Sequence, residues 1–199
     1  MKLLKTIAGL MIIAGLPSFA LAHNVAGEAS GLASGFAHPM SGLDHVLAML
    51  LVGVFAYQIG GRALWLIPMT FLVMMAIGGA LGLEGGMAQP SVELAIALSV
   101  VAFGIIALLG LKAPVPVVMG TTAFFAFHHG YAHSAEMPEQ SSGLEYAAGF
   151  ILATALLHST GILVSLAVDR LSEQGTRFLA RCAGTAGVIV GAGLTVGLI

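Results

Sequence analysis

The feature that most limits the possible folds of this chain is a set of six apolar segments. Each is close to the length needed to cross a lipid bilayer. They cover residues 43–59, 64–83, 92–110, 114–131, 144–168 and 180–198. Only 8% of the residues are charged and 58% are hydrophobic, whereas a soluble domain is about one quarter charged. This composition excludes a soluble globular domain and a disordered chain. The sequence therefore predicts an all-α polytopic membrane protein with six transmembrane helices, embedded in a lipid bilayer as one of its expected partners.

The N-terminus has the pattern of a secretory signal peptide. Lys2 and Lys5 precede a short apolar stretch, and small residues at Ala20 and Ala22 form a signal-peptidase site. We therefore expect a signal peptide over 1–22 and a single six-helix permease domain over 23–199; the alternative is an uncleaved first helix. Cleavage makes His23 the mature N-terminus, where its ring and the free α-amine could chelate a metal ion together.

The charged residues predict the orientation of the six helices. With the signal peptide removed, both termini lie outside, and every Lys and Arg of the mature chain falls on the cytoplasmic side. These basic residues are Arg62, Lys112, Arg170, Arg177 and Arg181. Most acidic residues fall on the outer side, which would concentrate cations there.

The net charge of −2 and the lack of a basic cluster argue against nucleic-acid binding, and the single cysteine excludes an intrachain disulfide. The glycine-rich helices leave the oligomeric state open.

The first cluster of possible metal ligands precedes the first span. It contains His38, Asp44 and His45, and Pro39 should keep His38 out of an α-helix. A turn after Pro39 could bring His38 back toward His45. Imidazole and carboxylate groups suit borderline divalent metals such as Ni(II), Co(II) and Zn(II). The alternative for Asp44 is helix capping together with Ser41.

The second cluster lies at the outer end of the fourth span. His129, His133 and Glu136 are spaced i, i+4 and i+7, so on a helix they share one face, and His128 stands next to them. Two histidines one turn apart can hold one metal ion. The alternative is a solvated histidine-rich loop.

The seventh histidine, His158, lies 13 residues after Glu145 inside the fifth span, about 20 Å deeper along the helix. Ionisable residues inside a membrane often mark a transport path. His158 is therefore either a deeper ligand on a cation path or a neutral histidine hydrogen-bonded to a neighbouring helix.

These motifs resemble those of the HupE/UreJ family of nickel permeases. The resemblance rests on Gly35-Phe36-Ala37-His38-Pro39 with Gly42-Leu43-Asp44-His45, on His129-Gly130-Tyr131-Ala132-His133 before Glu136, and on Leu157-His158. It covers essentially the whole mature chain. The resemblance implies a multi-pass secondary permease of the bacterial inner membrane, which takes nickel or cobalt into the cytoplasm for hydrogenase or urease assembly.

We therefore expect a permease and no enzyme: it carries Ni(II) or Co(II) as its ligand and has no prosthetic group. The expected metal site comprises His23, His38, Asp44, His45, His128, His129, His133, Glu136 and His158. Two alternatives remain open. An intramembrane zinc hydrolase could use the same ligands and a metal-activated water. A metal sensor or metallochaperone scaffold would need a cytoplasmic partner surface.

Overall fold

The computed structural model describes residues 31–137 and 142–198, and these residues form helices without a single strand. This confirms the all-α class. Each of the six apolar segments is one helix of the bundle. These helices are α3 (Leu43–Ile59), α4 (Ala63–Gly82), α5 (Gln89–Leu109), α6 (Val115–Ala135), α7 (Gly143–Asp169) and α8 (Glu173–Thr195). Helix α8 begins seven residues earlier than expected, because Ser172 accepts a hydrogen bond from the backbone N–H of Gly175 and caps it.

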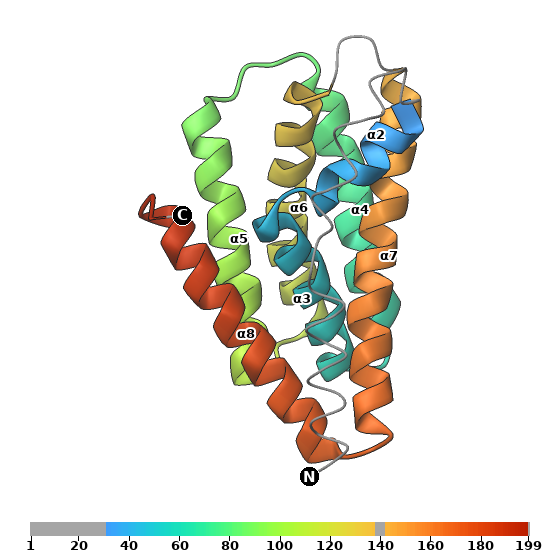
Figure 1. The fold of residues 1–199 in the computed structure, drawn as a ribbon, viewed down its shortest axis with the longest axis vertical. Coiled ribbons are helices and arrows are strands. Elements are labelled where there is room, and N and C mark those ends of the chain that lie inside the picture. Colours follow the sequence, from blue (N-terminus) through green and yellow to red (C-terminus); the bar gives the residue numbers. More distant parts are fainter. Residues whose placement is uncertain (1–30, 138–141, 199) are drawn as a thin grey trace, which may run out of the picture.

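One helical segment was not expected from the sequence. Helix α2 (Gly31–Ala37) and the 3₁₀ turn η1 (His38–Met40) precede α3 and are bent from it by 81°. In Figure 1, α2 lies across the upper half of the bundle, and α3 runs from the middle of the bundle to its lower end. The chain therefore breaks its helix inside the bundle, at the first histidine motif.

Within residues 31–137 and 142–198, four helices are long and apolar enough to cross a membrane, or five if α2, η1 and α3 count as one broken span. Helix α3 has only 17 residues, and the histidines of α6 lower its mean hydropathy. Six crossings and the orientation of the termini thus stay predictions. The expected signal peptide and His23 lie outside the described residues.

The basic residues gather at one end of the bundle. The connections α3–α4, α5–α6 and α7–α8 all lie at the lower end in Figure 1. Lys112, Arg177 and Arg181 line a cavity of about 350 Å³ there. Next to it, the Asp169 carboxylate accepts hydrogen bonds from the hydroxyls of Tyr57 (3.0 Å) and Thr176 (3.1 Å). These two bonds tie α3, α7 and α8 together at the end opposite the histidine motifs.

Helices α4 and α6 cross at glycine contacts close to the second histidine motif. A Cβ on Gly130 would collide with the carbonyl oxygen of Met75, and a Cβ on Gly78 would collide with that of Phe127. The two backbones can approach this closely only because both residues lack a side chain. The contact holds the C-terminal half of α6 in place, although glycine is a poor helix former.

We expect Gly130→Ala to destabilise the protein by about 2 kcal/mol, because the methyl group overpacks the α4–α6 contact. In a thermal unfolding scan in detergent this should lower the Tm by roughly 5 °C. The control is Gly120→Ala in the same helix, where a Cβ meets no described atom of another helix within 4 Å. Equal Tm values for the two variants would contradict the close crossing.

Candidate metal centre

The first histidine motif is built by a break between helices. Helix α2 ends at Ala37, as expected ahead of Pro39, and His38 opens the 3₁₀ turn. Ser41 does not cap α3. Its hydroxyl donates a 2.6 Å hydrogen bond back to the His38 carbonyl, and the extended residue Gly42 takes the N-cap position. Asp44 and His45 therefore lie in the first turn of α3.

The second motif lies on a regular helix. His129 and His133 are one turn apart on α6, and their exposed fractions are 0% and 4%. The alternative of a solvated loop is therefore wrong. Glu136 follows as the C-cap residue of α6 and is partly exposed. The buried histidines are the exception to the rule that ionisable groups stay at the surface, and such exceptions usually serve a function.

The two motifs meet in one histidine cluster. One ligand nitrogen each from His45, His129 and His133 lies within 4.8 Å of the other two. The ring centroids of His45 and His133 are 4.4 Å apart, and those of His45 and His129 are 5.2 Å apart. We call these three residues the histidine triad. His133 also belongs to a second, more exposed group with His38 and Glu136.

Each triad ring uses one nitrogen for a neighbouring acceptor. The Nδ1 of His45 lies 2.9 Å from Asp44 Oδ1, and the Nδ1 of His133 lies 3.2 Å from Glu136 Oε2. The Nε2 of His129 lies 2.8 Å from the hydroxyl of Ser99. This pattern is typical of metal-binding histidines, whose second nitrogen is held by a hydrogen bond.

The other three nitrogens are buried and have no hydrogen-bond partner among the described residues. They are Nε2 of His45, Nδ1 of His129 and Nε2 of His133. Buried polar atoms are nearly always satisfied, so three orphaned imidazole nitrogens in one place call for a ligand. A divalent metal ion accepts nitrogen lone pairs and would satisfy all three. In this arrangement Asp44 and Glu136 orient ligands and need not bind the ion themselves.

Glu136 links the two motifs. Hydrogen bonds from His133 and from His38 Nε2, which lies 2.9 Å from Glu136 Oε2, hold the pKa of the Glu136 carboxyl well below its ordinary value. The group is therefore a carboxylate and an acceptor for both rings. It fixes His38, on the turn before α3, against the end of α6.

Comparison with known proteins agrees with these motifs. The family model described as HupE / UreJ protein matches residues 10–194. The chain belongs to the HupE/UreJ family. Protein HupE of Rhizobium leguminosarum bv. viciae is 44% identical over 196 residues, which cover 98% of each of the two chains. No solved structure gives a significant match. The resemblance inferred from the sequence is thus confirmed.

Two further histidines of this HupE/UreJ chain lie outside the triad. His128 faces away from it and donates a 2.8 Å hydrogen bond from Nδ1 to the Phe124 carbonyl of its own helix. His158 is buried in α7, where its Nδ1 donates to the Met49 carbonyl of α3 at 2.8 Å. The Nε2 of His158 is buried and unpartnered within the described chain. His158 is thus a histidine bonded to a neighbouring helix that still offers a free lone pair.

A cavity with acidic residues in its wall reaches His45 of the triad. It has a volume of about 580 Å³ and is lined by Asp44, His45, Glu93 and Glu136, among others. Three carboxylates on its wall favour a cation over an anion or a neutral solute. Since His45 belongs to both the wall and the triad, this cavity borders the candidate metal centre.

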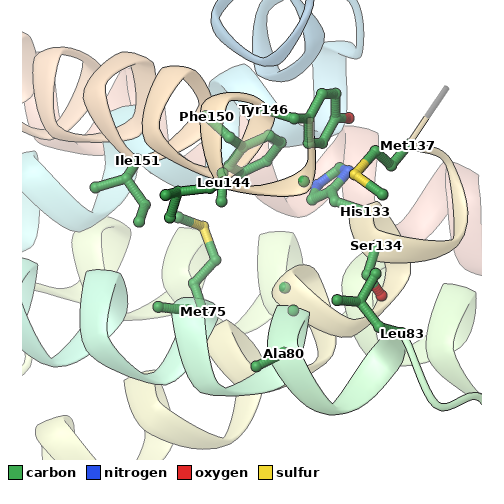
Figure 2. Close-up of a pocket in the computed structure, with 15 residues that line it drawn as sticks. Met75, Ala80, Leu83, His133, Ser134, Met137, Leu144, Tyr146, Phe150 and Ile151 are labelled. Carbon is green, nitrogen blue, oxygen red and sulfur yellow. The ribbon is translucent and has the colours of Figure 1, made fainter. Parts of the chain in front are cut away.

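A second cavity reaches His133 of the triad. It has a volume of about 340 Å³ and lies between α4, α6 and α7, where Figure 2 shows His133 beside Tyr146 and Met137. Met75, Phe150 and Ile151 make its remaining wall apolar. A hydrated cation would gain little there, so the acidic cavity is the better entrance.

Ser99 was missed in the sequence analysis. It is fully buried in α5, a helix of otherwise nearly uniform apolar character. The one available signal was an isolated hydroxyl in the middle of the 92–110 segment, which we interpreted as part of an ordinary span. The hydrogen-bond partner of Ser99 is His129 on α6, and the sequence does not show that α5 packs against α6.

Proposed function

We propose that this HupE/UreJ protein is a secondary permease for a divalent transition metal, with nickel as the first candidate and cobalt as the second. The observation that carries the proposal is the histidine triad: each ring offers one nitrogen within 4.8 Å of the other two, and each ring keeps one buried, unpartnered nitrogen. The acidic cavity supplies an entrance to them. Imidazole ligands suit borderline metals, and the family membership favours nickel or cobalt among these.

The proposed direction is from the periplasm into the cytoplasm. The basic residues lie at the end opposite the triad, which fits a cytoplasmic lower end in Figure 1. The sequence carries no nucleotide-binding P-loop, so ATP hydrolysis by this chain is not part of the proposal. A divalent cation that moves inward gains roughly 4.6 kcal/mol per 100 mV of membrane potential, twice the value for one charge. Facilitated diffusion driven by the potential is therefore sufficient.

The proposed location is the bacterial inner membrane, and the proposed role is the supply of metal to enzymes such as hydrogenase or urease. The metal ion is the transported substrate and not a resident cofactor. A carrier must release its ion, and a site of neutral imidazoles with carboxylates only behind them binds less tightly than one with several charged ligands.

The test is uptake by the purified full-length protein in liposomes, with Ni(II), Co(II) and Zn(II) compared side by side under an inside-negative potential. We expect uptake of Ni(II) or Co(II) that is faster than in protein-free liposomes and that rises with the potential. Binding without uptake of any ion would contradict the proposal. Tightly retained zinc together with lipid hydrolysis would support the hydrolase alternative instead.

A further inference from the structure

The hydroxyl of Ser99 makes two short contacts in the buried part of the bundle. Its Oγ lies 2.6 Å from the carbonyl oxygen of Ile96 in its own helix and 2.8 Å from Nε2 of His129 in α6. Ser99 and His129 are both completely buried. The pair joins α5 to the deepest ring of the triad.

The positions of the protons follow from these two distances. The carbonyl oxygen of Ile96 carries no hydrogen, so the 2.6 Å contact requires the Ser99 hydroxyl to donate its only proton to it. The same oxygen must then accept from His129, which means that Nε2 of His129 carries the ring proton. The Nδ1 of a neutral His129 is left with its lone pair, and this is the unpartnered nitrogen of the triad.

We propose that Ser99 is a positioning residue of the metal centre: it fixes His129 in the tautomer that leaves the buried Nδ1 lone pair free for a ligand. This inference rests on the proposed function, because it treats the triad as the metal site. Ser99 does for His129 what Asp44 does for His45 and what Glu136 does for His133. Unlike these carboxylates, the hydroxyl orients the ring without adding a negative charge. The deepest ligand is thus oriented while its basicity, and with it the affinity for the ion, stays moderate.

The test compares substitutions that differ only in the hydroxyl. Ser99→Ala removes the hydroxyl from the wild-type side chain. Ser99→Thr and Ser99→Val form a second pair, with and without a hydroxyl, whose side chains have nearly equal volume. In the purified full-length protein, Co(II) titration followed by visible absorption measures the affinity for Co(II). We expect a loss of about 10–100-fold in Ser99→Ala and Ser99→Val, and recovery to within about tenfold of the wild type in Ser99→Thr. Ser165→Ala is the control, because Ser165 is also buried and also donates to a helix carbonyl, that of Gly161, at 2.8 Å.

A readout without metal separates this inference from the proposed function. Ring-nitrogen NMR of ¹⁵N-histidine-labelled protein, with His129→Gln to assign the signal, reports which nitrogen of His129 carries the proton. We expect protonated Nε2 in the wild type and a mixture of tautomers in Ser99→Ala. An unchanged tautomer in both Ser99→Ala and Ser99→Val, with unchanged Co(II) affinity, would overturn the inference even if the wild type transports metal. A lack of uptake by the wild type would instead count against the permease itself.

Discussion

Replacement of His129 by alanine is expected to abolish metal uptake, whereas the same change at the adjacent His128 should leave it intact. His129 contributes one of the three unpartnered nitrogens of the triad and is completely buried. Loss of an orienting group behind a ligand already costs 10–100-fold in metal affinity, so loss of a ligand itself should cost more than about 100-fold. His128 bonds to its own helix at Phe124 and takes no part in either histidine group.

The two variants form a matched pair, because they remove the same side chain from neighbouring positions of α6. The measurements are Co(II) affinity of the purified protein and Ni(II) uptake in liposomes, with the Tm as a check on folding. Equal uptake in His129→Ala and the wild type would remove the triad from the transport path. A larger loss in His128→Ala than in His129→Ala would mean that the ion binds on the opposite face of α6.

Replacement of His158 by leucine should abolish uptake while leaving metal binding at the triad within about tenfold of the wild type. His158 offers a buried, unpartnered Nε2 on α7. The ring of Phe71 contacts the rings of both His158 and His129. Its centroid is 4.9 Å from that of His158 and 5.6 Å from that of His129. On the proposed path, an ion that leaves the triad inward meets Phe71 and then His158, and leucine offers it no ligand.

The measurement separates binding from movement: Co(II) titration reports the triad, and liposome uptake reports the whole path. Because leucine also removes the hydrogen bond to Met49, His158→Gln serves as a second variant that keeps an N–H donor but no imidazole. Ser159→Ala and Thr160→Val are neighbouring controls, since both hydroxyls only bond back to their own helix. Normal uptake in both His158 variants would show that His158 is only a structural histidine.

The helices and most of the candidate ligands could be predicted from the sequence. The apolar segments gave the positions of α3 to α8, because a bilayer-length run of apolar residues has few options other than a helix. The spacing of His129 and His133 placed both on one face of α6, because the helical period depends on the local backbone alone. The family followed from the short motifs around these residues.

The tertiary structure decided which of these residues act together. The sequence analysis included both His128 and His129 in the expected metal site, and the structure shows that only His129 contacts α3 and α5, through His45 and Ser99. The sequence analysis grouped Asp44 and Glu136 with the ligands, and the structure adds that each of them lies within hydrogen-bond distance of a triad histidine, His45 and His133 respectively. Pro39 predicted a turn after His38 but not the 81° bend between α2 and α3. The isolated hydroxyl of Ser99 did not reveal which residue it contacts. Contacts between helices depend on side chains far apart along the chain, such as Ser99 and His129, and a periodic pattern within one segment holds no information about them.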